Sequence, residues 1–429
     1  MKRPLLSRRH FLQTTALSLA APTILSSSVW SAEKRKLPSD RIVLGFIGMG
    51  TQARGLMNGF IRRNDTQVVA VCDVDSTRRE HAKKTVEDFY AKATDRPTFK
   101  GCSAYNDFRE LLERKDLDAV VIATPDHWHA IPVIAAANKR LDIYCEKPLS
   151  YSIHEARAMA KAVRKNKVIF QTGSQQRSSK EFRQACELVR NGRLGKLERI
   201  EVAVGGPSKW CDLPEEPAEP GLDWNFWLGP APMRVYNSVL SPRGVHTHFP
   251  NWRGYREYSG GAMTDWGAHH FDIAQWALGM DESGPVEIIP PADPHASFGA
   301  KFIYGNGIVM EHTNGNGVTF HGSNGKIYVN RGKFEATPAD LAKEPIGEKE
   351  IHLYKSDNHL GNWIDCIRSR QLPICDVEVG ARSVTVCHLG NLAYWNRRPL
   401  KWDPKKEKFI GDAQANQWLN PPKRAPWKV

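Results

Sequence analysis

A glycine-rich turn near the start of the chain has the first spacing that predicts chemistry. Gly48 and Gly50, followed by Thr51, Gln52 and Ala53, stand between a β-branched run and a helical pattern. Glycines here let the backbone pass close to a pyrophosphate, whose charge then faces the amides at the positive end of the helix. Ala53 is small enough for helix and strand to pack. The turn predicts a dinucleotide site, with a purely structural tight turn as the alternative.

A carboxylate at the end of the next predicted strand supports this interpretation. Asp73 is placed to accept hydrogen bonds from the ribose hydroxyls of the adenosine. Its charge would repel the additional phosphate of NADP, so the sequence favours NAD as the cofactor. Arg78 and Arg79 follow closely and could compensate for that repulsion, which leaves NADP open.

Lys147, Asp265 and His269 have the side chains that hydride removal from an alcohol carbon requires. That reaction needs a base for the hydroxyl proton and a nearby positive charge that stabilises the developing alkoxide. An imidazole and an ammonium group can supply these. If Thr264 caps a helix that Gly279 ends, Asp265 and His269 lie on one helix face. The carboxylate would then orient the imidazole and stabilise its charged form.

The segment from residue 205 to 254 is rich in aromatic residues and proline and precedes this predicted helix. Loops of this kind commonly line active sites, and aromatic rings stack on sugar rings, although buried loop packing explains tryptophan equally well. Five residues are candidates for contacting a substrate: Trp210 and Trp252 through their rings, Gln176 and Arg177 because they follow the predicted strand at 168–171, and His270 as the neighbour of His269.

A metal site is a weaker interpretation of the histidines. His246, His248, Asp265 and His269 are residue types that bind metals, but their spacing fits no recognised motif. A nicotinamide acceptor leaves a metal without a task, so we expect no metal.

The elements that must position these residues follow from the hydrophobic pattern. Short β-branched runs alternate with helical patterns after residue 41, which predicts a parallel sheet covered by helices. Predicted strands span residues 42–47, 68–72, 119–123, 143–145 and 168–171, and predicted helices span 52–63, 76–90, 106–113, 130–138 and 153–166. Later strands at 286–289, 298–304, 308–313, 318–321 and 326–330, separated by glycine, asparagine and proline, predict antiparallel hairpins, followed by helices at 360–368 and 377–395.

Three motifs in order resemble the glucose-fructose oxidoreductase, inositol dehydrogenase and MocA (Gfo/Idh/MocA) family. They are Ala123-Thr124-Pro125 with residues 126–129, Cys145-Glu146-Lys147-Pro148-Leu149, and the glycine-rich segment 259–269. The resemblance implies an N-terminal Rossmann domain at 40–173 and a C-terminal α/β domain with a large, mostly antiparallel sheet at 174–395, followed by an extension at 396–429. It also implies that the sheet's open face forms a homo-oligomer contact.

The same resemblance assigns roles to the motif residues. Lys147 would hydrogen-bond the reacting hydroxyl and the nicotinamide ribose, and His269 would take the proton. Further contacts to the cofactor would come from Thr124, Pro125, His129 and Glu146. The function implied is NAD(P)-dependent oxidation or reduction at a hydroxyl carbon of a sugar or cyclitol. A redox-assisted, NAD-dependent glycoside hydrolase is the alternative.

The first 32 residues predict export. Arg8 and Arg9 precede a short apolar run and then small residues, which is typical of a twin-arginine signal read by the twin-arginine export machinery. The run is too short for a permanent membrane anchor. A disordered basic N-terminus is the alternative. We therefore expect a periplasmic protein whose cofactor is loaded before export and stays tightly bound.

Composition excludes several other classes. Of 429 residues, 41% are hydrophobic and 25% charged, as in ordinary globular proteins. The net charge of +13 is scattered without a dense basic stripe, so we expect no nucleic-acid partner. Eight cysteines without a CxxC pair exclude zinc-ribbon and thioredoxin-like sites and leave disulfides open.

Overall fold

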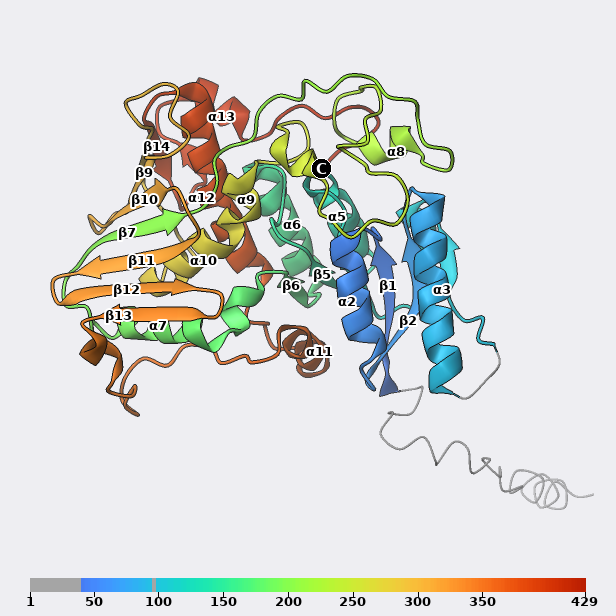
Figure 1. Ribbon diagram of the computed structural model, residues 1–429, viewed down its shortest axis with the longest axis horizontal. Coiled ribbons are helices and arrows are strands. Elements are labelled where there is room, and N and C mark those ends of the chain that lie inside the picture. The colour runs from blue at the N-terminus through green and yellow to red at the C-terminus, as the bar shows by residue number, and fades with distance from the viewer. Residues whose placement is uncertain (1–39, 95–97) are drawn as a thin grey trace, which may run out of the picture. The chain divides into compact units, whose positions relative to one another are not determined.

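A six-stranded parallel sheet forms the first half of the described chain, drawn in blue and cyan in Figure 1. The computed structural model describes residues 40–94 and 98–429, and the predicted signal at 1–32 lies outside them. The strand order is β3-β2-β1-β4-β5-β6. The strands are β1 (Ile42–Ile47), β2 (Thr66–Cys72), β3 (Ser103–Tyr105), β4 (Ala119–Ile122), β5 (Asp142–Cys145) and β6 (Phe170–Thr172).

Helices cover both faces of this sheet, and the predicted doubly wound arrangement is confirmed. Asp75 caps α3 by accepting from the amides of Thr77 and Arg78, and Ser152 caps α6. Gly50 precedes α2 as its N-cap and has no side chain to cap it, which leaves amides at the helix N-terminus for a ligand. The helices are α2 (Thr51–Ile61), α3 (Ser76–Ala93), α4 (Phe108–Leu111), α5 (Ala130–Asn138) and α6 (Ile153–Asn166).

A nine-stranded sheet dominates the second half, with the order β13-β12-β11-β7-β10-β9-β8-β14-β15. Among the described strands of this second sheet, only the β7–β10 pair is parallel, so the predicted mostly antiparallel sheet is confirmed. The strands are β7 (Leu197–Ala203), β8 (Glu287–Ile289), β9 (Lys301–Ile303), β10 (Val309–Thr313), β11 (Gly317–Gly322), β12 (Gly325–Asn330), β13 (Lys333–Thr337), β14 (Leu400–Asp403) and β15 (Lys408–Phe409). Residues 396–429, predicted as an extension, thus supply two of its edge strands.

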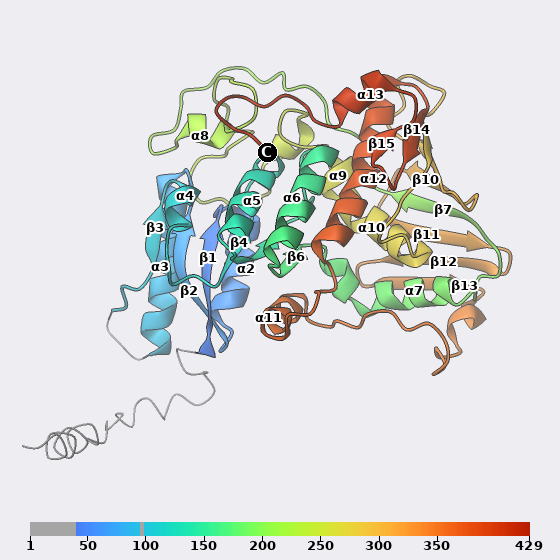
Figure 2. The ribbon, with the colours of Figure 1, turned by 180° about the vertical axis from the view of Figure 1, so that it is seen from behind.

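Two helices late in the chain connect the halves within the compact unit 42–429. α11 (His359–Ser369) packs on the parallel sheet's side, where the Trp363 ring lies 5.6 Å from that of Phe60. α12 (Val377–Asn396) packs against α6 on one side and α10 (Gly267–Leu278) on the other, as Figure 2 shows. The remaining helices of this half are α7 (Lys180–Arg190), α8 (Trp224–Leu228), α9 (Ala262–Asp265) and α13 (Ala413–Trp418).

The helix expected between Thr264 and Gly279 is interrupted. α9 ends at Asp265 and α10 begins at Gly267, so the prediction that Thr264 caps one continuous helix is wrong. The Thr264 hydroxyl donates to the Gly261 carbonyl instead. Gly267 is a poor helix former, and the His269 amide donates to the Trp266 carbonyl only three residues back. Gly279 does end α10, in the left-handed conformation.

All eight cysteines are free thiols in the structure. In the described part of the chain, no helix is long and apolar enough to span a bilayer.

Candidate active site

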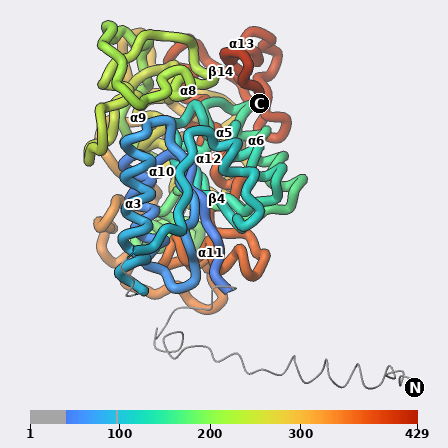
Figure 3. The backbone as a smooth tube through the Cα atoms, turned by 90° about the vertical axis from the view of Figure 1, so that its right-hand side faces the viewer, coloured from blue at the N-terminus to red at the C-terminus, as the bar shows by residue number. Residues whose placement is uncertain are grey.

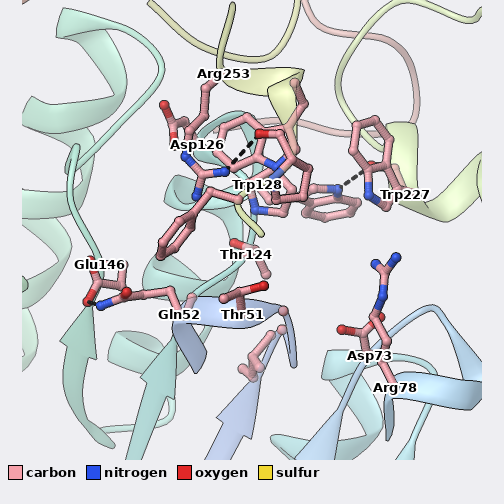
Figure 4. Close-up of a pocket in the computed structure, with 18 of the residues that line it drawn as sticks. Thr51, Gln52, Asp73, Arg78, Thr124, Asp126, Trp128, Glu146, Trp227 and Arg253 are labelled. Carbon is pink, nitrogen blue, oxygen red and sulfur yellow. Dashed lines mark hydrogen bonds between the residues drawn. The ribbon is translucent and has the colours of Figure 1, made fainter. Parts of the chain in front are cut away.

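A cavity of about 380 Å³ lies where the strands of the parallel sheet end and is lined by residues of both halves. This is the edge at which doubly wound sheets bind their ligands. Most of the predicted site residues line it: Gly48, Gly50, Thr51, Gln52, Asp73, Thr124, Pro125, Glu146, Lys147, Trp252, Asp265 and His269. Figure 4 shows Gln52 and Glu146 at one end and Asp73 and Arg78 at the other.

The two glycines of the β1–α2 turn have different tasks. Gly48 has φ +85°, and a Cβ there would approach the Ala123 carbonyl group to 2.9 Å. Gly50 has an ordinary φ of −67°, and a Cβ there would meet nothing within 4 Å. Gly48 therefore lets β1 and β4 approach each other, while Gly50 keeps space open in front of the uncapped end of α2.

Asp73 is held by the backbone at the end of β2. Its carboxylate accepts from the amides of Met49 at 2.7 Å and Asp75 at 2.8 Å. Burial raises the pKa of Asp73 although Arg78 acts in the opposite direction. Of the two arginines that left NADP open, Arg78 lines the cavity, whereas Arg79 donates to the Asp73 carbonyl at 3.0 Å.

The residues present fit a dinucleotide. Beyond the open space at Gly50, the cavity has buried polar atoms without hydrogen-bond partners, Thr124 Oγ1 and Gln175 Oε1. Such atoms suit the polar groups of a bound ligand. At the end of the cavity away from Asp73, Gln52 Nε2 donates to Glu146 Oε1 at 2.8 Å.

A loop that we call the strap (residues 241–250) crosses the N-terminal end of α2. Thr51 Oγ1 donates to the His248 carbonyl at 2.9 Å, and Arg54 donates to the His246 carbonyl. Arg78 donates to the strap's carbonyls at Pro242 and, at 3.3 Å, Gly244. The strap also lines the cavity, and Figure 1 shows this part of the chain above β1, α2 and α3.

Lys147 and Asp265 form a close ion pair across the cavity. Lys147 Nζ lies 2.5 Å from Asp265 Oδ1 and also donates to the Asp265 carbonyl at 3.0 Å. Burial alone would raise the pKa of Asp265, but the charges of Lys147 and Arg253 hold it below its usual value. The carboxylate is therefore ionised and keeps the ammonium group in place.

The predicted coupling of Asp265 to His269 is not present. No hydrogen bond joins these two side chains, both in the described part of the chain, because Asp265 ends α9 and turns to Lys147. His269 Nδ1 is buried without a partner. Burial, followed by the charges of Lys147 and Arg331, lowers the pKa of His269 well below its usual value. The imidazole is thus neutral, and its Nδ1 is not occupied by a hydrogen bond within the described part of the protein.

Several predicted residues lie away from the cavity lining. His129 is held between the carbonyls of Thr124 and Pro148, and Ala53 is buried where α2 packs. Arg177 is bound by Asp272 and Asp281 and is 2% exposed, so its guanidinium is not accessible to a substrate. The others are Gln176, Trp210, which is 62% exposed beside Arg256, and His270, which hydrogen-bonds Asn316.

Three charged residues of the cavity carried no prediction of a role. Asp126 belongs to a quoted motif; it accepts from Ser259 at 2.6 Å, and burial raises its pKa to about 7. Arg253 Nε lies 3.7 Å from Asp265 Oδ1. Arg331, between β12 and β13, has no motif around it, and only the folding of the second sheet brings it to the cavity.

The histidines do not gather as a metal site. His246 and His248 lie side by side with ring centroids 4.5 Å apart. Among residues 40–94 and 98–429, no group of three or more His, Cys, Asp or Glu side chains is arranged to hold a metal ion.

Comparison with known proteins agrees with this architecture. Residues 42–174 match the model described as "Oxidoreductase family, NAD-binding Rossmann fold", and residues 200–429 match "Oxidoreductase family, C-terminal alpha/beta domain". A myo-inositol 2-dehydrogenase of Thermotoga maritima is 26% identical over 240 residues, 56% of this chain and 55% of that protein. A glycosyl hydrolase family 109 protein of Shewanella pealeana is 24% identical over 241 residues, 52% of this chain and 51% of that protein. The chain thus spans about half the length of these curated relatives.

Solved structures share the fold. The WlbA dehydrogenase of Bordetella pertussis, in complex with NADH and UDP-GlcNAcA, has a TM-score of 0.59 at 17% identity, covering 85% of this chain and 99% of its own. The aldose-aldose oxidoreductase of Caulobacter crescentus has a TM-score of 0.56 at 18% identity, covering 84% and 99%. Because the C-terminal model alone matches more than half of the sequence, the chain belongs to the Gfo/Idh/MocA oxidoreductase family.

Proposed function

We propose that this protein is a NAD-dependent oxidoreductase that transfers a hydride between bound nicotinamide and a hydroxyl carbon of a sugar or cyclitol. One observation carries the proposal: the glycine turn, Lys147 and His269 line the same cavity. A dinucleotide site and a proton acceptor beside a cation are what alcohol oxidation needs.

The chain's own residues have separate tasks in this reaction. The nicotinamide supplies the hydride acceptor when it is bound. The Lys147 ammonium group hydrogen-bonds the substrate hydroxyl and stabilises negative charge on its oxygen, while Asp265 holds the ammonium group in place at 2.5 Å. The neutral His269 imidazole accepts the hydroxyl proton. Gln52 and Glu146, which hydrogen-bond one another in the cavity, would help to hold the cofactor.

Tight retention of the cofactor is part of the proposal. The strap is anchored to three residues of the nucleotide-binding half, Thr51, Arg54 and Arg78, and would lie over a bound pyrophosphate. Asp73 at the end of β2 favours NAD, while Arg78 in the cavity keeps NADP as the second nucleotide to test.

Export and assembly complete the proposed function. The twin-arginine pattern supports a periplasmic location reached with the cofactor already bound. Without free nucleotide there, the cofactor must be regenerated in place by a second substrate or by reversal of the first step. We also propose a homo-oligomer formed through the face of the nine-stranded sheet opposite its helices.

A redox-assisted glycoside hydrolase is the second candidate. The observation that favours it is the similarity to glycosyl hydrolase family 109 proteins. That chemistry oxidises the sugar transiently and returns the hydride after the glycosidic bond is cleaved, so it also needs a retained cofactor.

Two measurements on the purified protein test these proposals. Denaturation should release NAD or NADP, identified by mass spectrometry; a protein that neither releases nor binds either nucleotide would overturn both candidates. Free sugars and cyclitols should change the near-ultraviolet absorbance of the bound nicotinamide. Release of the aryl group from aryl glycosides, with no net change in that absorbance, would favour the hydrolase.

A further inference from the structure

Positive charge accumulates at the end of the cavity that contains His269. Lys147 and Arg253 approach the one carboxylate of Asp265 at 2.5 and 3.7 Å, and the charge of Arg331 also acts on it. Three cations thus share a single ionised carboxylate. Placing uncompensated cations together costs free energy, which a bound anion would offset.

Two other carboxyl groups lie nearby, and the charge of Glu146 also acts on Arg331, but among the described residues neither forms an ion pair with these cations. Glu146 hydrogen-bonds Gln52, and Asp126 hydrogen-bonds Ser259. Burial raises the pKa of both carboxyl groups, to about 7 for Asp126. Both are therefore more readily protonated than surface carboxyl groups.

Arg331 is held in position but is not paired. Its guanidinium lies over the Trp266 ring, 4.8 Å from the centroid. Its Nε donates at 3.2 Å to the Gln176 side-chain oxygen, in the amide orientation that also lets Gln176 donate to the His269 carbonyl. In the described part of the chain, no carboxylate forms an ion pair with it, whereas Arg177 has two such partners. The terminal nitrogens of Arg331 remain available to a ligand.

We propose that the substrate carries an anionic group and that Arg331 binds this group while Lys147 and His269 face the reacting hydroxyl. This inference rests on the proposed function and narrows its substrate class to acidic sugars, with a hexuronic acid as the simplest member. A guanidinium binds a carboxylate or a phosphate by two parallel hydrogen bonds, so a phosphorylated sugar offers the same chemistry. Arg331 would then determine specificity, and Arg253, which lies 3.7 Å from Asp265 Oδ1, would add positive charge.

The experiment compares matched sugars on the holoprotein with its bound nucleotide. Glucose, glucuronate and glucose 6-phosphate, together with galactose and galacturonate, are titrated by calorimetry and assayed for reduction of the nicotinamide. The variants are Arg331→Met and, as a matched control, Lys333→Met. Lys333 lies two residues further along the chain, at the start of β13, is 56% exposed and pairs with Glu335, and its loss changes net charge equally.

We expect at least one acidic sugar to bind about 10- to 100-fold more tightly than its neutral partner. Arg331→Met should remove most of that preference for the acidic sugar, while its affinity for the neutral sugar stays within about threefold of the unmodified protein's. Lys333→Met should retain the preference. If the uronic acids show the Arg331-dependent increase in affinity, the anionic group is a carboxylate; if glucose 6-phosphate shows it, the group is a phosphate.

Acidic sugars that bind no better than their neutral partners, or a preference unchanged in Arg331→Met, would overturn the inference whether or not turnover is seen. Turnover of neutral sugars in that case would leave the proposed oxidoreductase function intact. Binding of an acidic sugar without any change in the nicotinamide would instead count against the proposed function.

Discussion

His269 and His270 follow one another on α10 but face different surroundings. His269 lines the cavity, whereas His270 hydrogen-bonds Asn316 at 2.6 Å and stacks on Trp266. Because His269 is the proposed proton acceptor, His269→Asn should lower kcat by about two to four powers of ten with the fold intact. His270→Asn should keep most of kcat and lose about 1 kcal/mol of stability. Steady-state kinetics measures kcat of the two variants, and denaturant unfolding measures their stability. If His270→Asn loses more activity than His269→Asn, the base is His270.

The two glycines of the β1–α2 turn make a second matched pair. Gly48→Ala should destabilise the fold by about 1–3 kcal/mol, since Gly48 has φ +85° and its Cβ would collide with the Ala123 carbonyl group. Gly50→Ala should leave the melting temperature of the nucleotide-free protein unchanged but lower nucleotide affinity by at least about tenfold, because its Cβ enters the open space. Thermal unfolding and nucleotide titration test the pair. Equal loss of stability in both variants would contradict this division of tasks.

The sequence predicted residues whose role depends on a local motif and missed those brought in by tertiary structure. Gly50, Lys147 and His269 stand in recognisable motifs, and all three line the cavity. Arg331 lies in a polar hairpin turn without a signal of its own. Arg177 was predicted to reach the substrate because of its position after β6, but the sequence did not reveal that Asp272 and Asp281 would bind it.

At the scale of elements, an ion-pair cluster joins α6 of the first half to α12 of the second half. Arg157 donates to Glu378 at 2.6 and 2.8 Å, and Arg382 donates to the same carboxylate at 2.7 Å. Burial opposes ionisation of Glu378, yet the two arginines lower its pKa to about 2. A carboxyl group with a lowered pKa in the folded state stabilises the fold above its unfolded pKa, about 4.3, and loses that contribution as the pH falls toward 2.

Glu378→Gln should therefore reduce the free energy of unfolding by about 2 kcal/mol at neutral pH. The difference from the unmodified protein should shrink as the pH falls from about 5 toward about 2. Urea unfolding at several pH values measures it. Glu335→Gln is the control, because its pair with Lys333 is exposed and contributes little. A difference independent of pH would show that Glu378 acts through packing rather than charge.

Element prediction succeeded where the hydrophobic pattern was strong. The strand at β1 and the helices at α5 and α6 have the predicted bounds. β3 was missed because it is a three-residue, half-buried edge strand, and β7 because Glu198, Arg199 and Glu201 interrupt its apolar pattern. The continuous helix after Thr264 was wrong because the break at Trp266 depends on packing around Gly267 rather than on a local stop signal.

At the scale of the whole molecule, the predicted signal gives a direct test. Arg8→Lys combined with Arg9→Lys should leave folded, nucleotide-bound protein in the cytoplasm, because the export receptor reads the arginine pair. Cell fractionation with detection of the protein measures this, and an unchanged periplasmic fraction would refute the targeting proposal. Both residues lie outside the part of the chain that the structure describes.

The mutual arrangement of the halves was not predictable from local patterns. α11 was predicted as a helix, but nothing in its sequence indicated that Trp363 would pack on Phe60 of the first half. The C-terminus also returns to that half, close to α5 (Figure 3), and the Trp427 ring lies 4.7 Å from that of Trp128. Such contacts join residues far apart in sequence, and the hydrophobic periodicity of a segment does not predict which distant segment it packs against.

The strap has a consequence for steady-state kinetics. If the contacts of Thr51, Arg54 and Arg78 with residues 241–250 retain the nucleotide as proposed, it would stay bound between turnovers. One substrate would then transfer its hydride to the nicotinamide, and its oxidised product would dissociate before a second substrate binds in the same cavity and is reduced. This order of events is a ping-pong scheme, for which double-reciprocal plots at several fixed concentrations of the second substrate are parallel lines. At high concentrations, where the lines cease to be parallel, each substrate should inhibit competitively against the other, because both would bind in the cavity that Lys147 lines.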